Sequence, residues 1–279
     1  MHKKYSDFIQ RKKLWALLLS NVRSLYFLNI GILLLSEYIS CRDVLRALDA
    51  AGKITLPKRL TSGRKVSVAE RVVNMDHDTT PIEGALSEMT PLIVEVVTQK
   101  DKLKEFKSYI NQFHYLGYDR NIGENIKYFV YDRNGRVLAC LMFGSAAWSC
   151  DQRDRYIGWT REQRKVALKY MTNNSRFLIF PWVRVSCLAS HILSTICRRI
   201  SSDWMAKYGH PLYMLETYVE RNRFRGSSYA AANWKRVGIT AGKGRNCKTR
   251  FGELPMKDIY IYPLHKRFRE KLSETVAQE

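Results

Sequence analysis

A carboxylate stands inside an apolar run in the last third of the chain. Glu216 lies within residues 212–219, whose other members are mostly apolar or aromatic. A carboxyl group in such surroundings needs a partner or acquires a raised pKa, because burial disfavours its charged form. Glu216 is therefore a candidate general base facing a cleft. The alternative is a strand residue on a solvated face, or one paired with Arg223 or Arg225.

An arrangement suited to anions follows shortly after this carboxylate. Arg225 precedes Gly226 and then a short helix that Ser227 or Ser228 is predicted to cap. A guanidinium, a permissive backbone and a helix N-terminus together favour binding of a negatively charged group. We expect Arg225 to contact nucleic acid.

The predicted helix covers residues 229–237 and ends at Gly238. Tyr229 and Asn233 are four residues apart, which places them on one face of such a helix. Tyr229 could donate a proton, and Asn233 could read a base edge or an amide. The alternative is a packed helix whose asparagine caps a turn.

His114 is the fourth candidate for catalysis. It stands beside Tyr115, close to Gly117 and Tyr118, where a predicted helix gives way to a loop. A histidine at a helix end can act as an acid or base, or can cap the helix by interacting with its dipole.

Aromatic and basic residues alternate further along the chain. Trp148, Tyr156 and Trp159 interleave with Arg153 and Arg155. Bases could stack on the rings while the arginines hold phosphate. The alternative is the edge of a core with solvated arginines.

A glycine-rich segment near residue 240 is not a nucleotide-hydrolysis loop. Only three residues separate Gly238 from Gly242, and Gly244 follows Lys243 where a Walker A motif requires Ser or Thr. We expect instead a flexible basic loop in which Lys243 and Arg245 contact nucleic acid.

The composition indicates a folded protein with a polyanionic partner. The 279 residues are 46% hydrophobic and 26% charged, which excludes a disordered or fibrous chain. Forty-seven basic and 26 acidic residues give a net charge of +21, which favours nucleic acid, anionic lipid or acidic protein as a partner. None of the six cysteines forms a CxxC pair, which suggests reduced thiols in the cytoplasm. We expect no bound metal, because Asp76, His77 and Asp78 are adjacent and point in different directions.

The amino-terminal segment resembles a membrane span only in part. Its apolar runs are interrupted by Asn21, Arg23 and Asn29, whereas a span needs about 20 apolar residues. We expect buried helices, or a helix docked on a partner; a membrane anchor is the alternative. The predicted organisation is a helical or winged-helix-like module at 1–66, a linker at 67–90, the main domain at 91–265 and a tail at 266–279.

The pattern within the main domain predicts a mixed α/β fold (α+β). The expected strands are 92–97, 126–131, 136–143, 177–183, 212–219 and 259–262, and the expected helices are 101–113, one opening at Thr160, 187–207 and 229–237. This order resembles the Gcn5-related acetyltransferases (GNAT), whose splayed sheet holds a pantetheine arm. The join at residues 184–190 lacks the glycine of that family's phosphate loop, so we expect no acetyl-CoA or other cofactor.

Several longer strings resemble the DruA family, a component of the Druantia anti-phage system. They are HYLGY (114–118), RDRYIGW (153–159), NNSRFLIFPWVRV (173–185), LASH (188–191), LETYVERNRFRGSSYAAANW (215–234) and VGITAGKGR (237–245). The resemblance spans residues 41–264 and implies an antiviral role in concert with DruB, DruC, DruD and DruE. It implies no chemistry.

Three functions remain open. The chain could contact or recognise DNA for a partner translocase. It could be a transferase that modifies a nucleobase or a protein amine, with Glu216, Tyr229 and Asn233 in its cleft. It could also be a scaffold whose basic surface binds partner subunits.

Overall fold

The computed structural model describes residues 41–56, 72–119, 123–242 and 255–274. The chain divides into two compact units, residues 1–64 and 65–279. The first unit contributes one described helix, α2 (Cys41–Ala50), after which Gly52 adopts a positive φ of 67°. Residues 53–56, which follow this helix, form no strand. The winged-helix-like module stays a prediction, because most of residues 1–66 lie outside the described residues. The apolar segment before residue 36 lies outside the described residues.

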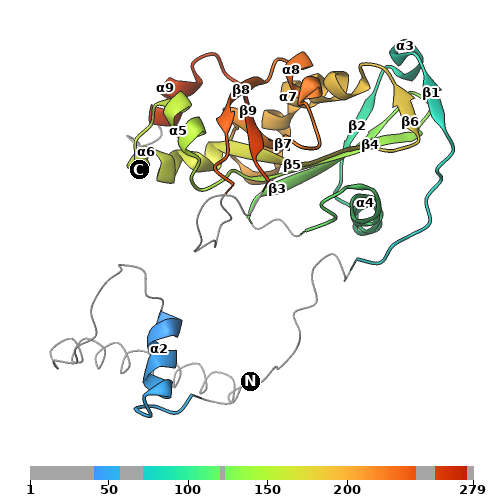
Figure 1. Ribbon diagram of the computed structural model, residues 1–279. Helices are drawn as coiled ribbons and strands as arrows, with labels where there is room; N and C mark the ends of the chain where they lie inside the picture. The colour runs from blue at the N-terminus through green and yellow to red at the C-terminus, as the bar shows by residue number, and fades with distance from the viewer. Residues whose placement is uncertain (1–40, 57–71, 120–122, 243–254, 275–279) are drawn as a thin grey trace. The chain divides into compact units, whose positions relative to one another are not determined.

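The second unit contains a seven-stranded mixed sheet with the order β2-β3-β4-β5-β7-β9-β8. Its strands are β2 (Ile93–Val96), β3 (Asn125–Tyr131), β4 (Val137–Ser145), β5 (Met171–Ile179), β7 (Met214–Glu220), β8 (Lys235–Ile239) and β9 (Lys257–Pro263). Every neighbouring pair is antiparallel except β5 and β7, which run parallel. The predicted mixed sheet flanked by helices is confirmed (Figure 1).

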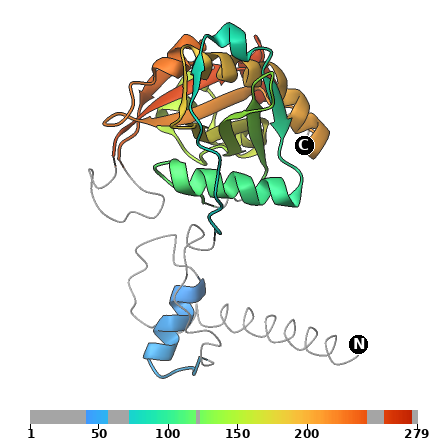
Figure 2. The same cartoon turned by 90° about the vertical axis from the view of Figure 1, so that its right-hand side faces the viewer.

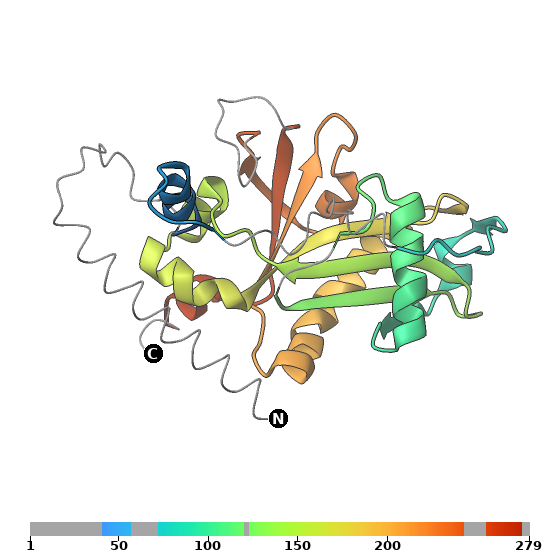
Figure 3. The ribbon, with the colours of Figure 1, turned by 90° about the horizontal axis from the view of Figure 1, so that it is seen from below.

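Helices cover both faces of this sheet. The helices are α3 (Leu86–Met89), α4 (Lys100–Phe113), α5 (Asp151–Ile157), α6 (Arg161–Ala167), α7 (Leu188–Tyr208), α8 (Ser227–Ala231) and α9 (Phe268–Glu274), with a 3-10 turn at Leu168–Tyr170. Figure 2 shows α4 lying along one face with α7 on the opposite side. Figure 3 shows α4 crossing β3 and β4, with α5 and α6 at the other end of the sheet.

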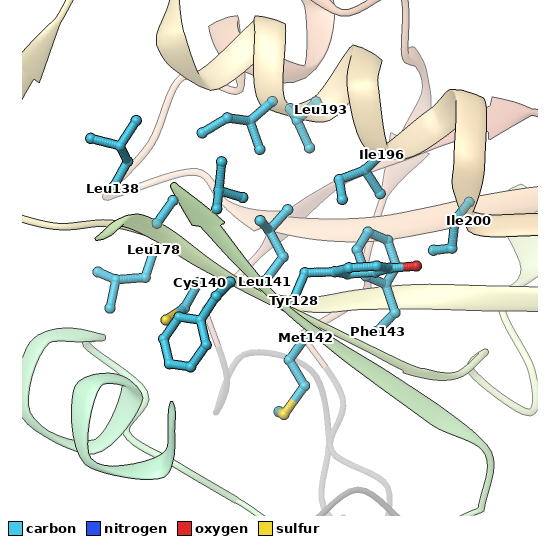
Figure 4. Close-up of a cluster of buried hydrophobic side chains, with 14 of the residues drawn as sticks. Tyr128, Leu138, Cys140, Leu141, Met142, Phe143, Leu178, Leu193, Ile196 and Ile200 are labelled. Atoms are coloured by element: carbon cyan, nitrogen blue, oxygen red, sulfur yellow. The ribbon is translucent and has the colours of Figure 1, made fainter. Parts of the chain in front are cut away.

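The long helix α7 supplies the centre of the core. Its apolar residues recur at every fourth position, which places them on one stripe of the helix. These side chains are at most 1% exposed, as a core-facing stripe requires: Leu188, Ile192, Ile196, Ile200 and Trp204. Figure 4 shows Leu193, Ile196 and Ile200 facing the side chains of β3 and β4.

Several expected boundaries are wrong. The linker at 67–90 contains β1 (Ile82–Gly84), which pairs in parallel with β6 (Val183–Val185), and also α3, whose Met89 is buried. The tail at 266–279 contains α9, whose Phe268 and Leu272 pack into a second apolar cluster. The strand expected at 177–183 begins at Met171 and ends at Ile179, two residues before Pro181. Short elements with few apolar residues gave too weak a periodic signal.

The residues just before β1 form a strap along α4. The backbone N–H of Met75 and the side chain of Gln112 both donate to the hydroxyl oxygen of Ser108, at 2.8 and 2.9 Å. The His77 ring stacks on Tyr109 with centroids 3.6 Å apart, and its Nε2 lies 2.8 Å from the same hydroxyl. These contacts fix the path by which the chain enters the main domain.

Candidate functional site

A cleft opens where the two parallel strands separate. β5 and β7 pair only at Met171–Asn173 and Met214–Glu216. One residue further on, a side-chain hydrogen bond takes the place of a backbone one between the strands: the hydroxyl of Thr217 donates to the carbonyl oxygen of Asn174 at 2.9 Å. The strands then diverge, and the space between them is a cleft of about 710 Å³. This volume lies within the range of small-molecule sites.

Asn174 fastens the inner end of the cleft. Its Oδ1 accepts a hydrogen bond from the Tyr229 hydroxyl at 2.6 Å, and its Nδ2 donates to the carbonyl oxygens of Met142 and Arg176. These bonds satisfy a buried amide and tie α8 to the separating strands. The sequence prediction missed this residue, because β5 reads MTNNSRFLI and an asparagine does not stand out in a strand that is already half polar.

Tyr229 lies in the cleft as predicted, and its hydroxyl is engaged. Burial raises the pKa of Tyr229 above its ordinary value, which keeps the hydroxyl protonated. A proton donor must point to its substrate, whereas this O–H points to Asn174. The geometry thus explains the residue by packing and hydrogen bonding.

Arg176 reaches the cleft because β5 carries a bulge. Phe143 pairs with Asn174 and Met142 with Arg176, so Ser175 is an extra residue that shifts the facing of the strand. The guanidinium donates to the carbonyl oxygens of Gly117 and Ser175 at 2.9 and 2.8 Å. Burial lowers the pKa of Arg176, and the charge of Asp119 opposes this shift.

His114 lines the cleft beside Arg176. It is the residue at which α4 ends, and its Nδ1 accepts a hydrogen bond from the backbone N–H of Leu116 at 3.2 Å. Burial, reinforced by the positive charge of Arg176, lowers the pKa of His114 to about 4. The ring is therefore neutral at physiological pH, and the occupied Nδ1 leaves the proton on Nε2. This histidine therefore lines the cleft with an N–H donor at Nε2.

The mouth of the cleft is aromatic and basic. Tyr115 and Phe224 are 38% and 49% exposed, with ring centroids 5.4 Å apart. The guanidinium of Arg223 lies 5.0 Å from the centre of the Tyr115 ring and 3.1 Å from Glu220. Arg225 is exposed and also lines the cleft. The sequence argument selected Arg225 but missed Phe224, which gave no periodic signal.

Gly226 is required where α8 begins. Its φ is 70°, and a Cβ at this position would lie 2.4 Å from the hydroxyl of Tyr260. Gly226 is itself the N-cap, so the expected serine cap is wrong. The expected helix at 229–237 is also wrong, because α8 ends at Ala231 and β8 follows. Asn233 is exposed between them with a φ of 63°, so it does not share a helical face with Tyr229.

Glu216 and Arg153 form a buried ion pair behind the cleft. Both side chains are 0% exposed, and Arg153 Nη1 lies 2.7 Å from Glu216 Oε2. Glu216 also accepts from the backbone N–H of Ala147 at 2.7 Å, and Arg153 contacts Asp154. The partner of Glu216 is thus Arg153 rather than Arg223 or Arg225. A phosphate cannot reach a fully buried Arg153, so we assign this arginine to the core.

The remaining predicted nucleic-acid contacts lie apart from the cleft or outside the described residues. Arg155 is exposed on α5. Of the aromatic residues near it, Trp148 is 60% exposed and Trp159 is buried. Lys243 and Arg245 lie outside the described residues.

Neither an acyl-CoA nor a metal is supported by the described residues. A second hollow of about 550 Å³ borders the join at 183–190. Within it the backbone of Cys187, which unlike a glycine carries a side chain, has a φ of 62°. Arg184 forms an ion pair with Glu83 at 3.3 Å. A pyrophosphate loop needs close backbone approach, and this join does not fit one. No metal-binding group of His, Cys, Asp or Glu occurs among the described residues, and no described helix is long and apolar enough to cross a bilayer.

Comparison with known proteins places the chain in a family. The protein is an α+β protein in which a mixed sheet opens into a basic, aromatic cleft large enough for a small ligand. The sequence model of one protein family, described as Druantia protein DruA, matches residues 52–247. The chain belongs to the DruA family, and is thus a component of a Druantia anti-phage defence system that includes other Dru proteins.

Solved structures resemble the chain in fold. Spermidine/spermine N-acetyltransferase SpeG from Vibrio cholerae shares 8% identity at a TM-score of 0.40, covering 64% of this chain and 96% of its own. A protein of Acinetobacter baylyi to which acetyltransferase activity is attributed shares 13% identity at a TM-score of 0.40, covering 64% and 99%. Likeness at this level does not bear on activity. No curated protein matches the chain.

Proposed function

We propose that this protein contacts nucleic acid for its Druantia system, and that the mouth of the cleft is the contact surface. The observation that carries the proposal is the cluster of Tyr115, Phe224, Arg223 and Arg225 around a cleft of about 710 Å³. Exposed aromatic rings stack on bases, and arginines hold phosphates.

The charges at the cleft support an anionic partner. The described lining residues include the cations Arg176, Arg225 and Lys257. The carboxylate among them is Glu220, which is 9% exposed and paired with Arg223. The net charge of +21 extends the same preference to the whole chain. A polyanion with flat rings fits this surface better than a neutral protein partner does.

The experiment measures binding of the full chain to a labelled single-stranded oligonucleotide between about 50 and 200 mM salt. Affinity should fall steeply, because each neutralised phosphate releases counterions. Arg225→Glu should weaken binding more than Arg161→Glu, an exposed arginine on α6 that does not line the cleft. An affinity indifferent to salt, or equal losses in both variants, contradicts the proposal. In that case retention of the other Dru proteins would favour the scaffold function.

A further inference from the structure

We propose that the interior of the cleft receives one unpaired nucleotide, with its phosphate at Arg176 and His114 and its base against the Tyr115–Phe224 pair. This inference rests on the proposed function and names what enters the same site. It predicts that the protein reads an unstacked nucleotide in addition to holding a charged surface.

The state of Arg176 points to an anion. Its guanidinium lies between the diverging strands and, within the described chain, makes its hydrogen bonds to two backbone carbonyl oxygens. The charge of Asp119 acts on this guanidinium and opposes the effect of burial on its pKa. A planar guanidinium can bind a phosphate through two parallel hydrogen bonds, which a carbonyl cannot match.

His114 complements this cation. With Nδ1 occupied by the Leu116 N–H, its Nε2 is a donor next to Arg176. Two neighbouring donors suit a group with two acceptor oxygens, and the phosphodiester of a nucleic acid strand offers two non-bridging oxygens. Because the ring is neutral, it adds a donor without adding repulsion to the neighbouring guanidinium. The same pair would be poorly matched to a cationic substrate such as an amine.

The aromatic side chains of the cleft can stack on a flat base. Tyr115 and Phe224 lie 5.4 Å apart and are tilted by 57°, so a base cannot slide between them. It can stack on their exposed sides, and Phe177 extends the apolar lining toward Tyr229, 6.3 Å away. A paired base has both of its faces covered by its neighbours, so only an unpaired or extruded base presents a free face.

The test uses the full chain and an oligonucleotide that carries a single 2-aminopurine in an unpaired position. Binding should change the fluorescence of this base, because it leaves its own stack and enters an aromatic site. Deoxyadenosine monophosphate should compete better than deoxyadenosine or inorganic phosphate alone, since it offers both components. A signal from the strand without competition by the mononucleotide would overturn the inference, because a cleft that receives one nucleotide must also bind that nucleotide alone.

The variants are Arg176→Gln and His114→Phe, with Arg161→Gln as the control on α6. Each cleft variant should lower the affinity for the mononucleotide about tenfold or more, because a charge-assisted or neutral donor to phosphate is lost. His114→Phe keeps the ring that stacks on Tyr115 at 4.9 Å, so it tests the site even where Arg176→Gln lowers folding stability. Thermal unfolding reports that stability.

The outcomes separate the two proposals. Steep salt dependence with unchanged binding by both cleft variants would overturn the nucleotide site and leave the surface contact intact. Binding of the mononucleotide without binding of any strand would overturn the proposed function and leave a site for a free nucleotide. Competition by coenzyme A that exceeds competition by deoxyadenosine monophosphate would overturn the inference in favour of an acyl carrier.

Discussion

Asn174 shows how a single side chain makes a cleft possible in the middle of a sheet. Where β5 and β7 part, unpaired backbone groups would be left buried, and an unmade hydrogen bond costs about 1–3 kcal/mol. The Asn174 amide and the Thr217 hydroxyl take the place of the missing ladder. Two polar side chains, those of Asn174 and Thr217, thus lie at the point where the strands separate.

Glu216→Gln should destabilise the protein by about 3 kcal/mol, because it leaves the buried charge of Arg153 without its main partner. Urea denaturation measures this change. The matched control is Glu220→Gln on the same strand, whose partner Arg223 is exposed, and it should cost at most about 1 kcal/mol. A stable Glu216→Gln protein that no longer protects cells against phage would instead restore the general-base interpretation.

Tyr229→Phe should cost about 1–3 kcal/mol of unfolding free energy, because the Asn174 oxygen loses its donor inside the protein. Chemical denaturation and a phage-protection assay on the same variant give the two readouts needed. Protection that falls in step with stability supports a structural hydroxyl. Unchanged stability with complete loss of protection would contradict it and favour a proton-donating role.

At the scale of elements, the strap across α4 depends on the protonation of one histidine. The Ser108 oxygen already accepts from Met75 and Gln112, so its own proton must go to His77 Nε2. That arrangement requires neutral His77. Burial lowers the pKa of His77, while the adjacent Asp76 opposes the shift. The lowered pKa means that folding favours the neutral ring.

The strap should therefore loosen in acid. Its stabilising contribution is complete above the ordinary pKa of histidine, about 6.5, and is lost as the pH falls through and below that value. The Met75 amide should lose protection in acid, which means that its hydrogen exchange becomes faster relative to the intrinsic rate at the same pH. His77→Phe, which retains a ring for stacking on Tyr109, should abolish this dependence. Identical pH profiles for the two proteins would refute the role of His77.

Elements with strong periodicity were predictable, and those shaped by tertiary contacts were not. The helix expected at 187–207, the helix opening at Thr160 and the strands expected at 126–131 and 136–143 all formed, and each has a strong local signal: an apolar stripe, a capping box with Gln163 and an Asn134-Gly135 turn. The helix expected at 229–237 failed because residues 235–239 instead complete the sheet beside β9. Edge-strand pairing overrides local helix signals, and one sequence contains no direct record of it.

The site was predictable in its location and less so in its chemistry. His114, Arg225 and Tyr229 do meet at one cleft. Glu216 does not line it, because this residue is still within the paired part of β5 and β7 and its side chain pairs with Arg153 in the core. Arg176 was missed because a bulge, which the pattern does not reveal, turns it into the cleft.

At the scale of the whole molecule, a net charge of +21 is paired with a localised aromatic opening. The charge draws in any polyanion and acts over roughly a Debye length, about 10 Å at 0.1 M salt. We propose that the opening confers a preference for unstacked bases. This division of labour makes affinity sensitive to salt and selectivity sensitive to the cleft.

Photo-cross-linking tests the central claim most directly. A single strand containing a photoreactive pyrimidine is irradiated with the full chain, and mass spectrometry identifies the linked peptides. The account predicts cross-links within residues 114–116 and 224–229, around Tyr115 and Phe224, and their loss in Phe224→Ala but not in Met205→Ala, an exposed apolar side chain on α7. Cross-links confined to other surfaces, or equal labelling of both variants, would contradict it.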